Sequence, residues 1–536
     1  MNEQASLLLT VGVVIIAGSQ ARATERYVPS PNYPTIQSAI NACVDGDEVI
    51  IEPNTYTGPG NRDLNFGGRA ITVRSIDPND PNIVTATIID CQRAGLGFYF
   101  NCGEGPNSVV AGLTITGGRA QWHGGGIYCG LSSPTITHCH IRDNFAWVHD
   151  GDVTGGGIWC RPESAARITH CLITGNWTEG YDMNISGGGG LHIGPQVLVS
   201  NCVIAGNSVC PDNDVPNHYG SAVLCYWGGT IRNCLITGNR NYSCEGFGAV
   251  FCFEGVVSIS NCAITDNDRL EYWGSAVASA YVDAMTIQNC ILWNPLLDEE
   301  LFVYSPSTTV LYSDVRGGRN SVYVQGGTLN WGDGNIDADP LFVDPDGPDG
   351  DPNTWEDNDY HLSVDSPCIT AGDPNGDYAG QTDIDGDPRV AHVWVDMGSD
   401  EYVGPLPYYA LSLVVKKWGQ SGPWIWGAVT VDPDRLVDPN DDPNDPNAPR
   451  EYPSGARPVL TAHDVGNKVF TKWKLWDLSD ANDANYPLID TNDVLYLTMN
   501  TDWRVLAAYD CGGGTELLLL VTLGALGALV LTRRRA

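Results

Sequence analysis

The sequence predicts an all-β protein: a right-handed, single-stranded parallel β-helix, followed by a small C-terminal β module and a terminal hydrophobic helix. Three observations lead to this fold class. A cysteine-centred segment recurs through the middle of the chain, where no stretch has helical periodicity. Gly and Pro are abundant, at 62 and 33 of 536 residues, which indicates many turns. Aromatic residues reach 9%, which is too many for a disordered chain.

The N-terminal sequence predicts that the protein is exported. Residues 7–17 (LLLTVGVVIIA) form an apolar run, and Ala21, Arg22 and Ala23 form a small-x-small cleavage site. Residues 1–23 are therefore predicted to be a cleaved signal peptide. The first residues include Glu3 and no Lys or Arg, which is atypical of such peptides, so an uncleaved anchor is the alternative.

The C-terminus, residues 511–536, combines a CGGG segment, an apolar run over 517–532 and three arginines. This order resembles the C-terminal sorting signals of bacterial surface proteins, and a plain tail anchor is the alternative. Sixteen residues in a helix span about 24 Å, short of the ~30 Å hydrocarbon core. The arginines would stay cytoplasmic by the positive-inside rule. The body of the protein is thus expected at the cell surface, with the membrane as a partner only through this segment.

The central repeat has a cysteine followed, five residues later, by an asparagine. Successive cysteines are 28 to 32 residues apart, and in the last repeat the asparagine follows after four residues. So short a unit cannot close its own core, but stacked coils can, because each strand pairs with its counterparts at about 4.8 Å. Identical residues then form ladders, predicted for Cys139 and Asn144, Cys171 and Asn176, Cys202 and Asn207, Cys234 and Asn239, Cys262 and Asn267, and Cys290 and Asn294.

A second, Gly-rich segment repeats in step and ends at Cys129, Cys160, Ile193, Cys225, Cys252 and Ser279. Its GGIxC pattern, followed by xIxxCxIxxN, resembles the right-handed β-helix repeats of the pectin-lyase-like superfamily. Residues 33–56 look like the capping helix and first strand of that superfamily, and segments 334–343, 360–368 and 395–402 resemble the closing segment of bacterial extracellular members. The resemblance implies a β-helix over 24–404. It implies no single chemistry, because this fold carries lyases, hydrolases, esterases, adhesins and plain binders.

The chain has 17 cysteines, most of them in these ladders. Side chains that point in parallel into a core are poorly aimed at one another. The ladder cysteines are therefore predicted to be buried free thiols that act as small apolar residues. Cys210 and Cys244 lie in loops off the ladders and are the better disulfide candidates.

Residues 405–510 lack the cysteine repeat and contain alternating strand-like segments, among them 409–415, 427–433, 455–462 and 495–499. They resemble the divergent InlB-like B-repeat of bacterial surface proteins. The resemblance implies a small β module that acts as a stalk near the anchor.

One corner of the coils varies most in length, because 7 to 13 residues separate the ladder asparagine from the next Gly-rich strand. Repeat proteins place function at such corners. These loops carry aromatic residues, which stack on sugar faces, and carboxylates, which bond hydroxyls. They predict a glycan-binding edge; aromatics that merely cover the loop bases are the alternative. The candidate residues are Trp122, Trp147, Asp152, Trp177, Glu179, Tyr181, Tyr219, Tyr272 and Trp273.

The predicted function is non-catalytic: binding of extracellular polysaccharide, or a structural or adhesive role in the envelope. The alternative is a polysaccharide lyase or glycoside hydrolase, since the same corner carries acids and histidines. No catalytic residue is assigned, because the superfamily's Gly-His-Gly and Gly-Arg-Pro-Trp strings are absent from the sequence. The net charge of −36, from 28 basic and 64 acidic residues, argues against nucleic acid as a partner.

No cofactor is required by this reading, and calcium is an optional ligand. Two loops place carboxylates at alternate positions around glycine, a pattern by which turns wrap Ca²⁺ in oxygens. Neither loop completes an EF-hand, and solvated turns are the alternative. The candidate ligands are Asp344, Asp346, Asp349, Asp383, Asp385 and Asp387.

Overall fold

The computed structural model describes residues 23–180, 185–209, 218–242, 247–269, 274–351, 354–392 and 394–405, and the backbone of nine strands between 408 and 524. Residues 1–22 of the predicted signal peptide, the loop cysteines Cys210 and Cys244, and the terminal residues 525–536 lie outside the described residues.

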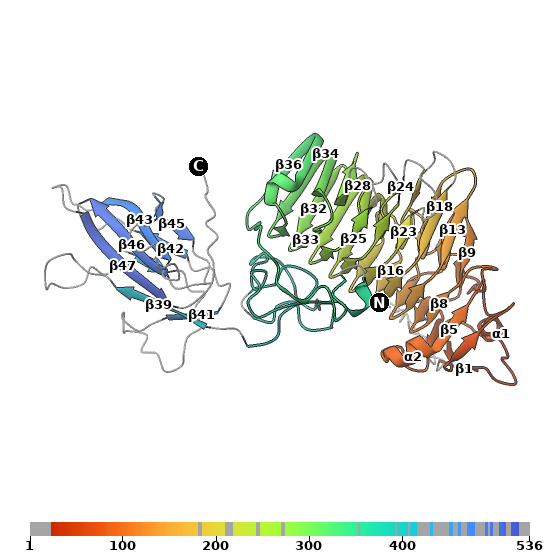
Figure 1. Ribbon diagram of the computed structural model, residues 1–536. Coiled ribbons are helices and arrows are strands. Elements are labelled where there is room, and N and C mark those ends of the chain that lie inside the picture. Colours follow the sequence, from red (N-terminus) through yellow and green to blue (C-terminus); the bar gives the residue numbers. More distant parts are fainter. Residues whose placement is uncertain are drawn as a thin grey trace, which may run out of the picture.

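Strands β1 to β36 form a parallel β-solenoid, coloured red to green along the chain (Figure 1). Within the described residues its largest sheet, sheet A, has 17 strands, and most coils contribute two of them. Sheet A contains β1 (Glu25–Val28), β2 (Glu48–Ile51), β4 (Thr72–Ser75), β6 (Phe98–Phe100), β7 (Val109–Ala111), β10 (Ile127–Cys129), β11 (Thr135–Thr137), β15 (Ile158–Cys160), β16 (Arg167–Thr169), β20 (Leu191–Ile193), β21 (Leu198–Ser200), β25 (Val223–Arg232), β28 (Val250–Ser260), β31 (Ser275–Ala280), β32 (Ala284–Gln288), β34 (Glu299–Leu311) and β36 (Val322–Trp331).

Three further parallel sheets complete the coils. Sheet B contains β3 (Asn54–Tyr56), β5 (Thr87–Asp90), β8 (Thr114–Thr116), β12 (His140–Arg142), β17 (Leu172–Thr174), β22 (Val203–Ala205), β26 (Leu235–Thr237), β29 (Ala263–Thr265), β33 (Ile291–Trp293) and β35 (Asp314–Val315). Sheet C contains β9 (Arg119–Gln121), β13 (Phe145–Val148), β18 (Trp177–Gly180), β23 (Ser208–Val209), β27 (Arg240–Asn241) and β30 (Asp268–Arg269). Sheet D contains β14 (Val153–Thr154), β19 (Ser186–Gly187) and β24 (His218–Tyr219).

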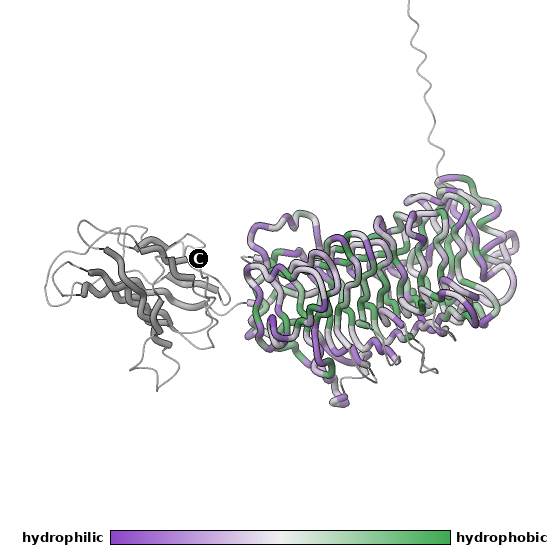
Figure 2. Tube along the Cα trace, turned by 90° about the horizontal axis from the view of Figure 1, so that it is seen from above, coloured by the Kyte–Doolittle hydropathy of each residue, from purple (hydrophilic) through white to green (hydrophobic). Residues whose placement is uncertain are grey.

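The pairing register confirms the predicted stacking of identical residues. Cys129 pairs with Cys160 in sheet A, and Ile141 pairs with Ile173 in sheet B. These side chains are fully buried, and the apolar positions recur from coil to coil along the solenoid (Figure 2). All cysteines of the predicted ladders are buried and free. Each short strand points two side chains into the core and one outward, so buried and outward-facing positions alternate along the repeat.

The residue before each ladder cysteine forms the corner between sheets A and B. It has a left-handed backbone, with φ between 51° and 54° at His138, His170, Asn201, Asn233, Asn261 and Asn289. Asparagine enters this region more easily than most residues because its short polar side chain bonds locally. The corner therefore favours the asparagine that precedes four of the six ladder cysteines.

The predicted asparagine ladder is confirmed along its length. The Oδ1 atom of Asn207 accepts hydrogen bonds from the backbone N–H and the Nδ2–H of Asn176, both at 3.0 Å, and the Nδ2–H of Asn207 donates to Asn239 in the same way. The ladder ends at Glu300, whose carboxylate accepts both N–H groups of Asn294, at 2.8 and 2.7 Å. Burial raises the pKa of Glu300 to about 7.

A short helix, α1 (Ile36–Ala42), covers the first coil as predicted and buries Ile36, Ala39 and Ile40. Thr35 and Ser38 form a capping box at its start, which satisfies the free backbone N–H groups there. A second helix, α2 (Pro81–Ala86), packs beside β5 and β8, and the 3₁₀ turn η1 (Gly318–Ser321) precedes β36.

Residues 334–405 return along the outside of the solenoid (Figure 1). They contain β37 (Phe342–Asp344), η2 (Trp355–Asp357) and β38 (Asp359–Leu362). Corner asparagines hold the segment: the Nδ2–H groups of Asn201 and Asn233 donate to the carbonyl of Thr382, at 2.9 and 2.8 Å. The predicted closing segment is thus laid across several coils.

Nine strands follow in two antiparallel sheets, an arrangement that fits a small β module. They are β39 (Tyr408–Val414), β40 (Val429–Val431), β41 (Arg450–Pro453), β42 (Val459–Ala462), β43 (Val469–Asp477), β44 (Leu488–Asp490), β45 (Val494–Tyr496), β46 (Trp503–Asp510) and β47 (Glu516–Gly524).

The start of the predicted terminal helix is a strand. Residues of β47 pair with β39 and β46, because a run rich in Leu, Val and Thr can satisfy its backbone in a ladder as well as in a helix. Among the described residues, no helix has the length and apolar character needed to cross a membrane.

Candidate ligand-binding face

A row of aromatic rings follows the outer side of sheet A. The middle residue of each short strand must point outward because its two neighbours point into the core. Tyr99, Tyr128, Trp159 and His192 occupy this position in four consecutive coils and lie in register. Their ring centroids are 4.9, 4.7 and 5.7 Å apart along the row.

In β25 the position in register with His192 is occupied by Leu224, which is not aromatic. From this coil onward the aromatic residues of the row lie at a neighbouring position of the strand. His192 stacks on Tyr226 at 5.8 Å, and Tyr226 stacks on Phe253 at 5.4 Å. Tyr281 then stands nearly perpendicular to Phe253, at 78°. We call the set from Tyr99 to Tyr304 the aromatic row: Tyr99, Tyr128, Trp159, His192, Tyr226, Phe253, Tyr281 and Tyr304.

Stacking within the row covers many ring faces, and exposure differs along it: Tyr99 is 36% exposed, whereas Trp159 and His192 are buried. Two members in its middle are buried and lack hydrogen-bond partners: the Nε1–H of Trp159 and both ring nitrogens of His192. Buried polar groups are seldom left unpaired. Burial also lowers the pKa of His192 to about 3, so this ring is neutral at pH 7.

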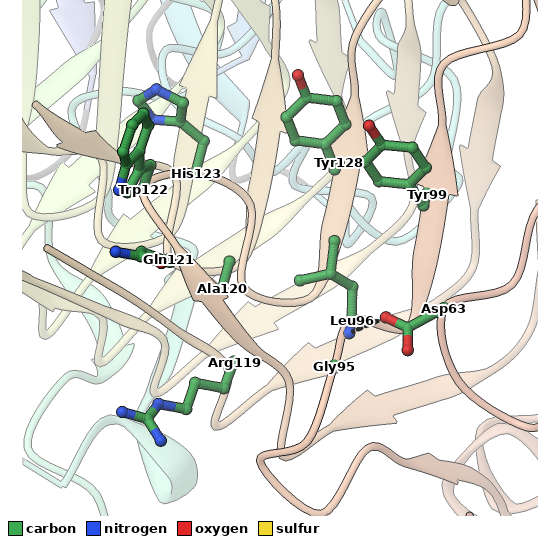
Figure 3. Close-up of a pocket in the computed structure, with 10 residues that line it drawn as sticks. All are labelled: Asp63, Gly95, Leu96, Tyr99, Arg119, Ala120, Gln121, Trp122, His123 and Tyr128. Carbon is green, nitrogen blue, oxygen red and sulfur yellow. Dashed lines mark hydrogen bonds between the residues drawn. The ribbon is translucent and has the colours of Figure 1, made fainter. Parts of the chain in front are cut away.

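A cavity of about 420 Å³ opens at the N-terminal end of the row (Figure 3). It lies beside β9, which is the first strand of sheet C, so the preceding coil offers no strand to fill the space. We call it the Trp122 cavity. It is lined by Asp63, Gly95, Leu96, Tyr99, Arg119, Ala120, Gln121, Trp122, His123 and Tyr128.

Trp122 has an unusual backbone in this cavity. Its φ is 95°, a region that costs a bulky L-residue of the order of 1–3 kcal/mol. Two backbone hydrogen bonds hold it there: its N–H donates to Trp147 O at 3.0 Å, and its carbonyl accepts from Thr154 N at 3.1 Å. The side chain is 52% exposed. The chain thus presents a large apolar ring to solvent at an energetic cost.

The charges around this cavity are few. The carboxylate of Asp63 accepts a hydrogen bond from Leu96 N at 2.8 Å. The guanidinium of Arg119 lies over the rings of Phe145 and Trp147, at 5.7 and 4.9 Å, and extends away from the two tyrosines in Figure 3. Burial lowers the pKa of His123 to about 4, so it is neutral at pH 7.

A second cavity, of about 520 Å³, lies at the other end of the row, and we call it the aromatic cavity. Apart from Asp152 and Gln325, its lining consists of aromatic and aliphatic side chains. The lining residues are Asp152, Ile185, Tyr219, Leu224, Tyr226, Phe247, Phe251, Phe253, Ala280, Tyr281, Phe302, Tyr304 and Gln325.

The structure divides the predicted glycan-binding residues among several places. Trp122 lines one cavity, and Asp152 and Tyr219 line the other. Trp147 and Trp177 instead lie on sheet C, where Arg119 covers Trp147 and Trp177 stacks on Phe145 at 4.9 Å. Glu179 pairs in register with Trp147 on the same sheet. Tyr181, Tyr272 and Trp273 lie outside the described residues.

The aspartates of the predicted calcium loops bond their own turns. Asp383 Oδ1 accepts the backbone N–H groups of residues 385, 386 and 387, and Asp383 Oδ2 accepts that of Glu401. Asp349 likewise binds Asp351 N and Thr354 Oγ1. Among the described residues, Asp344, Asp346 and Asp387 belong to no group of three or more acids, histidines or cysteines that could hold a metal ion. Calcium binding at these loops stays a prediction.

Within the described residues, His361, Asp385 and Asp400 form a cluster that could hold a metal ion. Both ring nitrogens of His361 contact carboxylates, of Asp359 and Asp385. The hydrogen bond to Asp385 is the main cause that raises the pKa of His361 to about 10. In the ion-free protein the imidazolium is therefore ion-paired with Asp359 and Asp385, and a metal ion would have to displace its proton.

Sequence reasoning missed Tyr99, Tyr128, Trp159 and His192. Their signal was the variable residue of the GGIxC segment, which lies between two inward positions and so must face outward.

The family described as "Right handed beta helix region" matches residues 35–194 and 148–295. No curated protein matches the chain significantly. A crystal structure of pectate lyase Pel9A is similar at 16% identity, covering 71% of this chain and 97% of that chain, with a TM-score of 0.34. The family match and the parallel register agree on a right-handed parallel β-helix. The likeness to the pectate lyase is too weak to carry an argument.

Proposed function

We propose that this chain is an exported, surface-attached protein whose Trp122 cavity and aromatic row bind extracellular polysaccharide without cleaving it. Trp122 carries the proposal. Its half-exposed indole is held over a cavity in a strained backbone conformation. Such strain clusters at ligand sites, where a fixed geometry is useful. An indole face is a platform for the apolar face of a sugar ring.

Polar groups around the indole suit sugar hydroxyls. The phenols of Tyr99 and Tyr128, the amide of Gln121 and the carboxylate of Asp63 line the same cavity. Because coils repeat at about 4.8 Å, a ligand lying along the row meets similar groups in several coils, as an extended chain would require.

The charges favour uncharged sugar units. Arg119 is the one cation that lines the Trp122 cavity among the described residues, and its guanidinium is engaged with Phe145 and Trp147. His123 is neutral at pH 7, and Asp63 is acidic. With a net charge of −36 on the chain, a polyuronate would be repelled.

The test is to incubate the purified protein with a panel of neutral and acidic polysaccharides. Binding is measured by affinity electrophoresis, and reducing ends and unsaturated products are measured in the same mixtures. Retention by a neutral polysaccharide without product supports the proposal. Chain cleavage would replace it by the lyase or hydrolase alternative. Absence of binding to any polysaccharide would leave a structural role.

A further inference from the structure

The aromatic cavity differs from the Trp122 cavity in its chemistry. Its volume of about 520 Å³ falls in the range of small-molecule sites, roughly 300–1,000 Å³. Sugar recognition needs several hydrogen-bonding groups, yet most of this lining is aromatic or aliphatic. The feature left to explain is one carboxylate, Asp152, at the edge of a cavity walled by aromatic rings.

The rings of the cavity face in more than one direction. Tyr219 and Phe251 are nearly parallel, with centroids 4.5 Å apart and an interplanar angle of 20°. Tyr281 is nearly perpendicular to Phe253 and to Tyr304, at 78° and 77°. Rings in crossed orientations can present faces and edges to one enclosed group. A ring face carries negative quadrupole charge and attracts cations.

The electrostatics of the cavity favour positive charge. No Lys, Arg or His is among its lining residues, all of which are described. Asp152 is exposed, and its Oδ1 accepts a hydrogen bond from Ile185 N at 3.0 Å. Burial raises the pKa of the Tyr226 phenol, and the charges of Glu254 and Asp152 raise it further, so both acids act on the lining. Among the described lining residues, no cation therefore offsets the charge of Asp152.

We propose that the aromatic cavity binds a small organic cation of the quaternary ammonium type. The methyl groups of such a cation would contact the rings, its charge would interact with their faces, and Asp152 would supply the counter-charge. An uncharged apolar ligand of the same shape would fill the space but would gain no attraction from the charge of Asp152. The cavity shares Tyr226, Phe253, Tyr281 and Tyr304 with the aromatic row of the glycan proposal. The cation proposal nevertheless depends on Asp152, whereas the glycan proposal depends on Trp122.

The test compares two isosteric probes on the full-length protein by calorimetry at low salt: choline, and 3,3-dimethylbutan-1-ol, its neutral analogue. Choline is expected to bind at least tenfold more tightly. Equal binding of the two probes, or binding of neither, would overturn the proposal.

Variants locate the site. Asp152→Asn keeps an oxygen that can accept the Ile185 N–H, so the fold should survive, and choline affinity should fall about tenfold while the neutral probe is unaffected. The matched control is Asp45→Asn, because Asp45 is also exposed and also accepts one backbone N–H, from Ala70 at 2.9 Å, far along the chain. If Asp45→Asn weakens choline binding as much as Asp152→Asn does, binding reflects only the overall charge, and the proposal fails.

Discussion

The side chains on the inner side of sheet A differ in their surroundings from those on the outer side of the same strands. On the inner side, Cys129 and Cys160 stack in register and are fully buried. On the outer side, Tyr128 and Trp159 stack just as regularly, but they border open space or carry unpaired polar atoms. The inner repeat is required by the stacking of coils. The outer repeat is not, so its aromatic character calls for another reason, and ligand binding supplies one.

The asparagine ladder makes the contrast sharper. Each amide between Asn144 and Asn267 has partners in the coils beside it, and the hydrogen bonds repeat with nearly constant lengths. Trp159 and His192, on the outer side of sheet A, have unpaired ring nitrogens. The ladder amides are thus satisfied within the fold, whereas these two side chains are not.

The largest effect is expected from a charge on the inner side. Cys202→Asp would bury an unpaired carboxylate between Cys171 and Cys234, at a cost of several kcal/mol, and should unfold the solenoid. Cys202→Ala removes only a small apolar group and should cost about 1–2 kcal/mol. Thermal unfolding followed by circular dichroism distinguishes the two. An Asp variant with the melting temperature of the wild type would show that the side chain at position 202 does not point into the core.

A smaller loss is expected from the asparagine ladder. Asn207→Leu leaves the Asn176 N–H groups and the Ile173 carbonyl without partners, at about 1–3 kcal/mol for each unsatisfied group. Asn330→Leu is the control, because Asn330 is exposed and makes only long hydrogen bonds, of 3.4 and 3.5 Å. Chemical denaturation measures both. Similar losses in the two variants would show that ladder position does not matter.

The end of the ladder should make stability depend on pH. The pKa of Glu300 is raised from its ordinary 4.5 to about 7 in the folded protein, so its stabilising contribution is complete below about pH 4.5 and is lost as pH rises through 7. Asp314 and Asp396, with pKa values also raised to about 7 by burial, act in the same direction.

Glu300→Gln tests this effect, because a glutamine has no charge to bury at pH 8. The two Asn294 N–H groups donate to different oxygens of Glu300, so the single glutamine oxygen has to accept both, as the ladder amides do. We expect the variant to match the wild type at pH 5 and to melt at a higher temperature at pH 8. An equal difference at both pH values would contradict this account of the ladder's end.

The inner side could be predicted from the sequence because stacking forces like residues into like positions. The cysteine and asparagine ladders follow from that rule and are present. The helix α1 was expected instead from the resemblance of residues 33–56 to a capping helix, and it is also present. The outer side could be predicted only in part. Trp147 and Trp177 were expected in variable loops, but their segments continue the ladder as β13 and β18, and pairing fixes them on sheet C.

The calcium pattern shows why some site predictions are ambiguous. Aspartates at alternate positions around glycine also build turns in which one carboxylate accepts several backbone N–H groups, as Asp383 does. The spacing of residues is the same in both cases. Only contacts between distant segments, such as that of Asp383 with Glu401 N, separate the two.

The smallest effect on stability, and the most informative one, is expected at Trp122. Glycine tolerates a φ of 95° that strains tryptophan, so Trp122→Gly should keep or raise the melting temperature. Loss of the indole should at the same time weaken binding of a neutral oligosaccharide about tenfold, or 1.4 kcal/mol. Tyr27→Ala is the control, since Tyr27 is 46% exposed and lines neither cavity.

The measurement that tests the central claim most directly is therefore one pair of numbers for Trp122→Gly: its melting temperature and its dissociation constant for a neutral oligosaccharide that the wild type binds. The account predicts an unchanged or higher melting temperature together with a dissociation constant about ten times larger. A lower melting temperature with unchanged binding would contradict it, because Trp122 would then serve the fold and not a ligand.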